Sequence, residues 1–264
     1  MGHEDPWAIL VSEVMLQQTS TSRVLDPWRR FLGAFPTPAA CARAPLAEVL
    51  TLWSGLGYHR RARALHECAR ALCERHDGRV PSTVAQLRAL PGVGEYTAHA
   101  VASFAFGVPV AVLDTNVGRV LARAIANRTL GAGEARALAA TVLPRRDVAQ
   151  FNQSMLDLGA QFCRAVARCE GCPVARVCRW RAQGGPDPAP RSAGVSRPQG
   201  AFEGSDRQLR GRVLAQLRIR PVSRGDLEAT MIEIDPPRRE RVLSSLIDDG
   251  LIEVAGRWVR LVSH

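Results

Sequence analysis

The chain has 264 residues, of which 46% are hydrophobic and 23% are charged. This length and composition suffice for a buried core and exclude a disordered tail or a small disulfide-stapled scaffold. Its 35 basic residues are all arginine, and they exceed the 25 acidic residues to leave a formal net charge of +10. No lysine is available for Schiff-base chemistry, and the excess of guanidinium groups favours phosphate binding. A genomic bias toward arginine is the alternative origin of both features.

We expect a cytoplasmic protein that does not enter a membrane. The sequence holds no run of 18 apolar residues, and its first five residues start neither a secretory signal nor a myristoylation site. Seven cysteines, an odd number without a secretory signal, argue against a disulfide framework.

Residues 5 to about 180 are predicted to form consecutive short helices. Apolar residues recur there every three or four positions, and Gly, Pro, Ser and Asp separate the segments. The first helix opens at Asp5-Pro6, another runs from Pro45 to near Trp53, and a third runs from about Tyr58 to Asp77-Gly78. We expect one wet basic face on the third helix, whose arginines are at positions 60, 61, 63, 70 and 75.

The composition shifts to Pro, Gly, Ala, Ser and Arg over residues 183–204, which predicts a linker between a domain at 1–182 and a smaller domain at 205–264. Three helical patterns follow the linker, near 205–218, 223–230 and 236–249. Apolar residues alternate with other residues on both sides of Ala255-Gly256, as in a β-hairpin. This order predicts a winged-helix-like module, which would bind either DNA or protein.

Four cysteines lie within 16 residues, in the spacing C-x5-C-x2-C-x5-C, directly after a predicted helix. They are Cys163, Cys169, Cys172 and Cys178. Four thiolates this close can enclose one compact inorganic centre, and ligation would fold a loop that is too short to have its own core. We interpret the loop 163–178 as an iron–sulfur site. Zinc is the alternative, although its usual pair of C-x2-C motifs is absent. The other cysteines, Cys41, Cys68 and Cys73, are expected to be small core residues.

The segment Leu90-Pro91-Gly92-Val93-Gly94 lies between two predicted helices, Val84 to Leu90 and Glu95 to Phe106. Gly92 and Gly94 allow a tight turn, after which the second helix presents unpaired N–H groups that can hold a DNA phosphate without reading base sequence. This is the helix-hairpin-helix pattern. A glycine-rich turn between helices also occurs in proteins that do not bind DNA.

Two acidic residues are candidates for catalysis. Glu13 lies among apolar residues of the first helix, where burial would raise its pKa and make it a proton donor near neutral pH. Asp114 stands where a helix begins, and an ordinary N-cap is the alternative role. Cleavage of a glycosidic bond needs one carboxylic acid to protonate the leaving group and one carboxylate to stabilise the oxocarbenium-like sugar.

The chain resembles the helix-hairpin-helix DNA glycosylases over residues 6–180, most closely the MutY-type adenine DNA glycosylases. The motifs are SEVMLQQT (12–19), LWSGLGY (52–58), LPGVGEYTA (90–98), LDTNV (113–117), FNQSMLDLGA (151–160) and the four cysteines. The resemblance implies a mainly α, two-lobed fold with a [4Fe-4S] cluster. It also implies a monomeric, monofunctional hydrolase of base excision repair. Such an enzyme flips adenine mispaired with 8-oxoguanine or guanine out of double-stranded DNA.

The resemblance further implies roles for single residues. Glu13 matches the acid that protonates adenine N7, and Asp114 matches the carboxylate that stabilises the sugar cation. Tyr96 stands where lyase relatives carry a catalytic lysine. This agrees with the absence of lysine from the chain and implies that water is the final nucleophile. Asn116 matches a supporting asparagine. The residues implied in DNA binding are Leu16, Gln18, Tyr58, Gly92 and Gly94, together with Arg164 and Arg168 of the cysteine loop.

Three features depart from the family pattern. The chain begins after the position of the usual Leu-Pro-Trp-Arg segment, so we expect a start assigned too far downstream or a natural truncation. The first cysteine gap is five residues instead of six. The tail, with FEGSDRQLRG at 202–211, resembles the shorter actinobacterial-type tail instead of the usual domain that reads 8-oxoguanine. A thymine or uracil mismatch glycosylase and a non-catalytic iron–sulfur DNA-binding regulator remain the alternatives.

Overall fold

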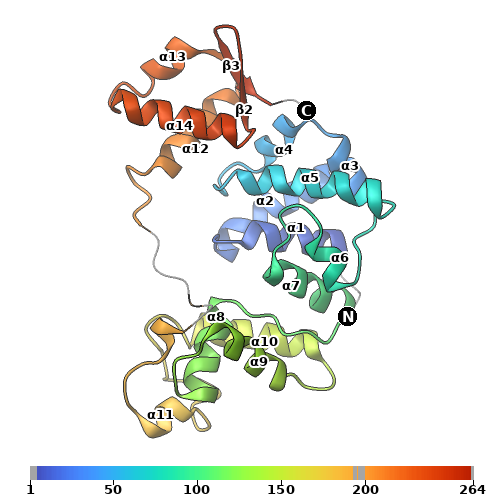
Figure 1. Ribbon diagram of the computed structural model, residues 1–264, viewed down its shortest axis with the longest axis vertical. Helices are drawn as coiled ribbons and strands as arrows, with labels where there is room; N and C mark the ends of the chain where they lie inside the picture. The colour runs from blue at the N-terminus through green and yellow to red at the C-terminus, as the bar shows by residue number, and fades with distance from the viewer. Residues whose placement is uncertain (1–4, 193–194, 196–199, 263–264) are drawn as a thin grey trace. The chain divides into compact units, whose positions relative to one another are not determined.

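The computed structural model describes residues 5–192, 195 and 200–262 and shows a mainly helical protein with a small C-terminal sheet (Figure 1). The chain forms two compact units. One unit holds residues 82–88 and 93–199, and the other holds residues 7–81, 89–92 and the C-terminal residues from 200 onward. The C-terminal residues therefore belong to the same unit as the N-terminal helices. The predicted domain limits at 182 and 204 stay a prediction.

The N-terminal helices begin where the sequence supplies a helix start. They are α1 (Pro6–Leu16), α2 (Thr21–Ala34), α3 (Pro38–Arg43), α4 (Leu46–Leu52) and α5 (Arg60–Arg75). In α3, the side chain of Thr37 accepts a hydrogen bond from the Ala40 amide, and Pro38 fills the first turn. Helices α3 and α4 both pack against α5. The fully buried Phe31 and Trp53 meet edge to face at 6.3 Å between ring centroids, so this group of helices has its own aromatic core.

The other unit is built from helices joined by short loops. They are α6 (Val84–Arg88), α7 (Glu95–Phe106), α8 (Thr115–Val120), the π-helical turn η1 (Leu121–Ala126), α9 (Ala132–Thr141), α10 (Val148–Gln161), α11 (Arg179–Gln183) and the 3-10 turn η2 (Ala189–Arg191). Helix α10 packs directly on α8. A Cβ at Gly159 would lie 2.5 Å from the carbonyl oxygen of Asn116, so this helix contact requires glycine.

The C-terminal residues form a helical module with a small sheet (Figure 1). Its elements are α12 (Asp206–Leu217), β1 (Val222–Ser223), α13 (Arg224–Ala229), α14 (Pro236–Asp248), β2 (Ile252–Ala255) and β3 (Trp258–Leu261). The predicted hairpin is present, with Val254 opposite Val259. The sheet has a third strand that the sequence analysis did not predict, since β1 pairs with β3 to give the order β1-β3-β2. A strand of two residues has no periodicity of its own and forms only through its partner.

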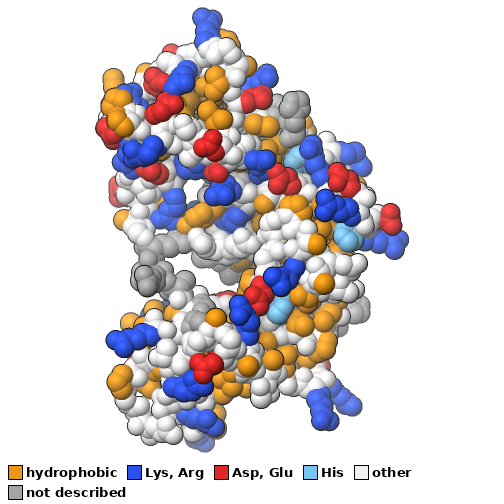
Figure 2. All heavy atoms as spheres, in the orientation of Figure 1, with side chains coloured by type: hydrophobic (Ala, Val, Ile, Leu, Met, Phe, Trp, Pro, Cys, Tyr) orange, Lys and Arg blue, Asp and Glu red, His pale blue; other side chains and the backbone are white. Residues whose placement is uncertain are grey.

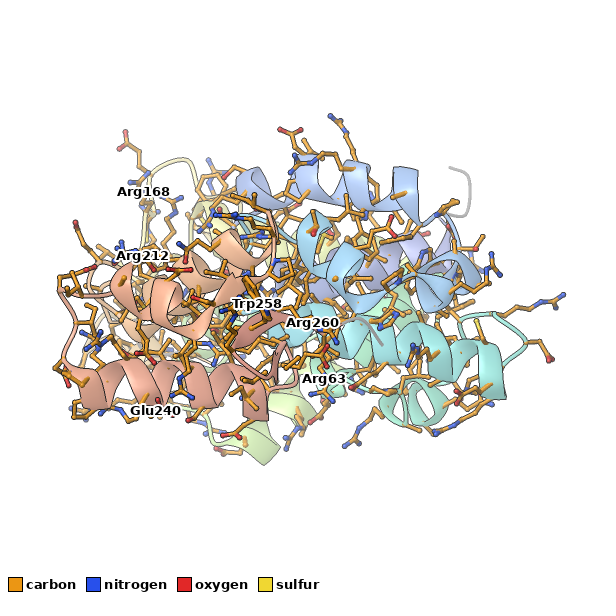
Figure 3. The ribbon with its side chains drawn as sticks, turned by 90° about the horizontal axis from the view of Figure 1, so that it is seen from above. Arg63, Arg168, Arg212, Glu240, Trp258 and Arg260 are labelled. Carbon is orange, nitrogen blue, oxygen red and sulfur yellow. The ribbon has the colours of Figure 1, made fainter. Side chains whose placement is uncertain are left out.

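Arginine and acidic side chains are interspersed on the surface of the C-terminal module (Figure 2). Arg212 of α12 pairs with Glu233 at 2.8 Å, and Arg224 pairs with Glu240 of α14 at 2.6 Å. Figure 3 labels Arg212 and Glu240 on these two helices. Exposed pairs of this kind contribute little to stability. They do offset part of the positive charge of the module.

The first half of the predicted linker is packed against helical residues. Ala189 is fully buried, and the Ser192 hydroxyl accepts a hydrogen bond from the amide of Leu130 at 3.1 Å. Within the part of the chain that the structure describes, no helix is long and apolar enough to cross a bilayer.

Candidate active site and cysteine loop

Glu13 lies on α1 and is buried, with 7% of its surface exposed. It is flanked on the helix by apolar residues, among them the buried Leu10 and Val14. The structure therefore buries the side chain of Glu13, as the sequence analysis expected, and its role as a proton donor stays a prediction. The rise in its pKa stays a prediction.

Arg61 of α5 caps the carboxyl end of α1 and is not part of a wet basic face, so the expectation for this residue was wrong. Its guanidinium donates hydrogen bonds to the carbonyl oxygens of Val14 (2.9 Å), Met15 (2.9 Å), Gln17 (2.6 Å), Leu56 (3.3 Å) and Gly57 (3.4 Å) and to the hydroxyl of Thr19 (3.1 Å). Burial lowers the pKa of Arg61 to about 10, and the group remains charged at neutral pH. A cation at this position satisfies the last carbonyls of α1 and also holds the loop before α5.

Two of the residues implied in DNA binding have a strained backbone beside Arg61. Gln18 has φ of +57° and Tyr58 has φ of +47°, a left-handed conformation that is unusual for side chains of this size. Gln18 is exposed, whereas Leu16 and Tyr58 are half-buried. The carbonyls of neighbouring residues accept the hydrogen bonds of Arg61, so this arginine keeps both strained residues in place.

The hairpin between α6 and α7 has the expected tight turn, but only one of its two glycines is required by it. Gly92 has φ of +72°, and a Cβ there would lie 2.7 Å from the Cβ of Ala64 on α5. Gly94 caps α7 with φ of −80°, an extended conformation open to any residue, and has no atom within 4 Å of an added Cβ. Both glycines are exposed, so the backbone amides around them are accessible to a phosphate.

Asp114 caps α8 and is the first member of a chain of hydrogen bonds. Its Oδ1 accepts from the amide of Val117 at 2.8 Å, and its Oδ2 accepts from the side chain of Asn116 at 2.7 Å. Asn116 Oδ1 in turn accepts from Arg119 at 2.5 Å, and Arg119 also donates to the carbonyl of Cys163 at 2.6 Å. Burial raises the pKa of Asp114, and the bonds from Val117 and Asn116 and the charge of Arg119 oppose that rise. Asp114 therefore caps α8 and also has a carboxylate whose orientation is fixed by hydrogen bonds.

Tyr96 lies in the first turn of α7 and is half-buried. Together with Leu113, the residue before Asp114, it lines a cavity bounded by α7 and α9. The loop at this cavity is held by Asn152 of α10, which donates to the carbonyl of Val110 at 2.9 Å and accepts from the amide of Val112 at 3.3 Å. The backbone that leads into Asp114 is therefore fixed by a buried amide side chain.

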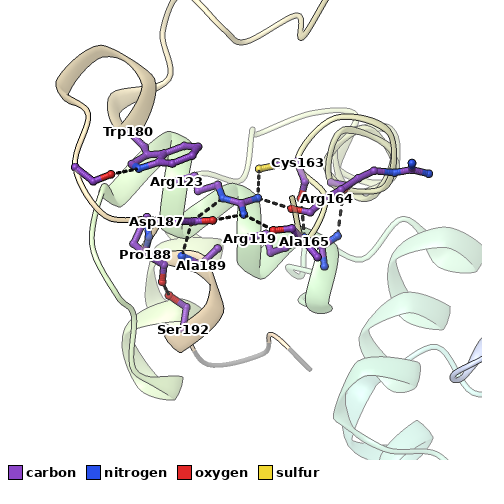
Figure 4. A network of polar contacts seen from close by, with 12 residues as sticks. Arg119, Arg123, Cys163, Arg164, Ala165, Trp180, Asp187, Pro188, Ala189 and Ser192 are labelled. Carbon is purple, nitrogen blue, oxygen red and sulfur yellow. Dashed lines mark hydrogen bonds and ion pairs between the residues drawn. The ribbon is translucent and has the colours of Figure 1, made fainter. Parts of the chain in front are cut away.

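The cysteine loop is held by Arg123, which lies in the π-helical turn after α8 and is 1% exposed (Figure 4). Its guanidinium donates to the carbonyls of Arg164 (2.6 Å) and Ala165 (3.0 Å), to both carboxylate oxygens of Asp187 (2.8 and 2.5 Å) and to the sulfur of Cys163 (3.5 Å). The ring of Trp180 lies 5.4 Å away. Although burial alone would lower the pKa of Arg123, the bonds to Asp187 and Cys163 raise it, so the charge is permanent.

All four cysteines of the loop line one cavity, together with basic side chains that include Arg123, Arg168 and Arg181. Among the described residues, no three Cys, His, Asp or Glu side chains lie close enough together to hold a metal ion. Four thiols as donors and a basic surround that offsets negative charge do fit an iron–sulfur cluster. Arg164 and Arg168 are exposed on this loop, and Figure 3 labels Arg168.

The remaining cysteines lie in the helices α3 and α5. Cys41 and Cys68 are fully buried, and Cys73 is half-buried. Burial raises the pKa of both buried thiols to about 12. They are protonated core residues at neutral pH.

Comparison with known proteins assigns this architecture to a family. A family model described as HhH-GPD superfamily base excision DNA repair protein matches residues 11–145. The adenine DNA glycosylase of Mycobacterium tuberculosis (strain ATCC 25618 / H37Rv) is 45% identical over 263 residues, covering 96% of this chain and 84% of the relative. The chain belongs to the adenine DNA glycosylase family of this superfamily. The member from Mycolicibacterium smegmatis is 44% identical over 253 residues, 94% of this chain and 84% of its own length.

More distant members of the superfamily match a smaller share of the chain. The human adenine DNA glycosylase is 42% identical over 182 residues, which is 66% of this chain and 33% of the human protein. Among solved structures, a thermostable thymine-DNA glycosylase superposes with a TM-score of 0.62 at 28% identity, covering 68% of this chain and 85% of that one. A trapped endonuclease III–DNA covalent intermediate superposes with a TM-score of 0.61 at 28% identity, covering 69% and 87%.

Sequence analysis missed the arginines that organise both parts of the site. Arg119 follows Asn116 by three residues, and Arg123 follows Arg119 by four. Helical spacing therefore places all three on one face of the helix. Asn152 and Gly159 lie within a quoted family motif, but only the structure shows that one holds a loop and the other allows helix contact. No signal in the sequence distinguishes Arg61 from the exposed arginines around it.

Proposed function

We propose that this glycosylase removes adenine mispaired with 8-oxoguanine or guanine from double-stranded DNA, by hydrolysis and without strand cleavage. The observation that carries the proposal is the partly buried carboxylate of Asp114, oriented at a helix start by Asn116 and Arg119. The two mycobacterial relatives, which match over nearly the whole chain, are both adenine DNA glycosylases.

In the proposed reaction, Glu13 donates a proton to N7 of an adenine that has been flipped out of the duplex. Cleavage of the glycosidic bond leaves positive charge on deoxyribose, and the ionised Asp114 stabilises that charge. Water then completes the hydrolysis and an abasic site remains. Asn116 keeps Asp114 oriented, and Tyr96 assists from the first turn of α7. The proposal requires Glu13 and Asp114 to meet at one nucleotide.

We propose that Cys163, Cys169, Cys172 and Cys178 hold a [4Fe-4S] cluster, with zinc as the alternative. When bound, the cluster would cross-link the loop, and hydrolysis of a glycosidic bond consumes no electrons. Arg123 bonds to the carbonyl of Arg164 at the start of the loop and pairs with Asp187, which follows α11. Absorbance near 400 nm with about four irons per chain would support the cluster. One tightly bound zinc would contradict it.

Phosphate contacts are proposed to supply most of the DNA affinity. The hairpin at Gly92 and Gly94 offers exposed backbone amides, and Arg164 and Arg168 add exposed guanidinium groups. We propose that the protein acts as a monomer in the cytoplasm. Its affinity for DNA should fall steeply as the NaCl concentration is raised. An affinity that does not change with salt would contradict this part of the proposal.

The deciding experiment compares base release from duplexes that carry A:8-oxoguanine, A:G, T:G or U:G. We expect release of adenine from the first two duplexes. The structural similarity to a thymine-DNA glycosylase makes release of thymine the second candidate. Glu13→Gln should abolish release and keep DNA affinity. A protein that binds all four duplexes and releases no base would be a regulator.

A further inference from the structure

The C-terminal module carries a groove that is lined by none of the residues proposed for catalysis, DNA binding or the cluster. The groove has a volume of about 420 Å³ and is lined by residues from the end of α12, from α13 and from the sheet. Its apolar lining includes Ile219, Val222 and Trp258. The function proposed above therefore leaves this groove without a role.

The apolar side chains of the groove are exposed to water. Ile219, which follows α12, is 82% exposed, and Trp258 of β3 is 43% exposed (Figure 3). A single exposed aliphatic side chain is ordinary on a protein surface. An exposed tryptophan in the same groove is less ordinary, because aromatic residues are enriched at contact surfaces between proteins. Both side chains would leave water if a partner filled the groove.

The walls of the groove are held by hydrogen bonds. The hydroxyl of Thr230, at the end of α13, donates to the side-chain oxygen of Gln216 on α12 at 3.2 Å. The amide of Arg224, at the start of α13, donates to the carbonyl of Arg257, the residue before Trp258, at 2.9 Å. A partner would therefore meet a preformed surface, and little free energy would be lost in ordering it.

Positive charge at the groove is not offset as it is elsewhere on the module. Arg220 lines the groove, and the guanidinium of Arg257 lies 5.1 Å from the centroid of the Trp258 ring. Within the part of the chain that the structure describes, neither arginine has an ion pair. Other exposed arginines of the module do pair with glutamates, namely Arg212, Arg224 and Arg260.

The acidic residue that lines the groove is already engaged. The carboxylate of Asp226 accepts a hydrogen bond from the hydroxyl of Ser223 at 2.7 Å, and the Ser223 hydroxyl accepts from the amide of Asp226 at 3.1 Å. Asp226 is thus held at the start of α13, while Arg220 and Arg257 stay open to an anionic partner.

We propose that this groove binds an acidic segment of a partner protein, which places an apolar side chain against Ile219 and Trp258 and carboxylates at Arg220 and Arg257. The apolar lining favours a peptide over nucleic acid, because a phosphate backbone has no apolar side chain to bury there. The two arginines without ion pairs favour an acidic segment over a basic one. The module would then serve as a protein contact, which is one of the two roles that its sequence predicts.

The test measures fluorescence anisotropy of a fluorescein-labelled peptide that has six aspartates followed by leucine and phenylalanine. We expect saturable binding by the full chain at micromolar concentrations. A peptide with two serines in place of leucine and phenylalanine should bind about tenfold more weakly. This second peptide separates binding in the groove from simple attraction to a protein with a formal net charge of +10. A peptide with lysines in place of the aspartates should not bind.

Variants then place the peptide. Trp258→Ala should weaken binding about tenfold, Trp258→Phe should restore most of it, and Arg220→Gln should weaken it about fivefold. The matched controls are Ile232→Ala and Arg241→Gln, because both residues are exposed on the module but neither lines the groove. Both controls should bind as the wild type does. Release of adenine should be unchanged in all of these variants.

Several results would overturn the inference. One is an absence of saturable binding by the folded wild-type protein, or equal binding of the peptide that lacks leucine and phenylalanine. Another is an equal loss of affinity in Ile232→Ala and Arg241→Gln. Weaker binding of undamaged duplex DNA by Trp258→Ala and Arg220→Gln, with peptide binding unchanged, would assign the groove to nucleic acid. A loss of peptide binding in Trp258→Ala alone, together with a lower melting temperature, would assign Trp258 to the fold of the module.

Discussion

Arg61 and Arg123 organise irregular backbone in two different parts of the molecule, and their partners differ in kind. Arg61 is surrounded by neutral acceptors, five backbone carbonyls and one hydroxyl, and by the rings of Trp53 and Tyr58. Arg123 has a carboxylate partner, Asp187, and reaches a cysteine sulfur. Among the described residues, the region with an aromatic core is thus completed by a cation that has no acidic partner, whereas the short cysteine loop is held by an ion pair.

The largest effect is expected from loss of Arg61. Arg61→Ala leaves buried carbonyls without donors, and we expect it to lower the free energy of unfolding by about 3–5 kcal/mol in urea titration. Arg61→Lys should not rescue the protein, because a lysine has one ammonium in place of a planar fork of donors. Arg60→Ala is the control, since the Arg60 side chain is 77% exposed. Equal losses for Arg61→Ala and Arg60→Ala would show that the hydrogen bonds of Arg61 contribute little.

Loss of Arg123 should have its main effect on the cysteine loop. Arg123→Gln breaks the buried pair with Asp187 and the bonds to the loop carbonyls, so we expect about 2–4 kcal/mol lower stability and a reduced iron content after purification. Arg164→Gln, at an exposed position on the same loop, should retain iron. Full iron occupancy in Arg123→Gln would indicate that the thiols alone order the loop, which would reverse the contrast drawn with Arg61.

The stability of the protein should depend on pH because of His59, a buried residue near Arg61. Burial and the charges of Arg218, Arg210 and Arg61 lower the pKa of His59 to about 4, so the folded protein keeps this residue neutral. The unfolded chain takes up the proton near pH 6.5, and the folded chain does so only near pH 4. Stability should therefore fall as pH drops through this window, by at most about 3 kcal/mol. His59→Gln should flatten the dependence in chemical unfolding at pH 7, 5.5 and 4. A variant that loses stability as steeply as the wild type would assign the effect to other groups.

The sequence predicted elements that depend on local signals and missed contacts that depend on the fold. Pro6 at the start of α1 and Asp114 at the start of α8 were identified because a helix start is encoded within a few residues. Arg61 was expected in water because its neighbours on the same helix are charged. Three of its five carbonyl partners come from residues more than 40 positions away, and no local pattern predicts them. Strand β1 was missed for the same reason, as it exists only through β3.

The smallest effect, and the most specific to catalysis, is expected at Arg119. Its charge holds down the pKa of Asp114, which burial raises. Arg119→Gln removes that charge, so the pKa of Asp114 should rise further and the ionised fraction should fall at mildly acidic pH. The acidic limb of single-turnover adenine release should then move to higher pH, with the rate falling about tenfold per pH unit below it. Arg136→Gln, which loses only an exposed pair with Glu95, should keep the wild-type limb. A uniform loss of rate at every pH in Arg119→Gln would mean that Arg119 supports the fold of α8 without tuning the carboxylate, because a change in the ionised fraction must be overcome by raising the pH.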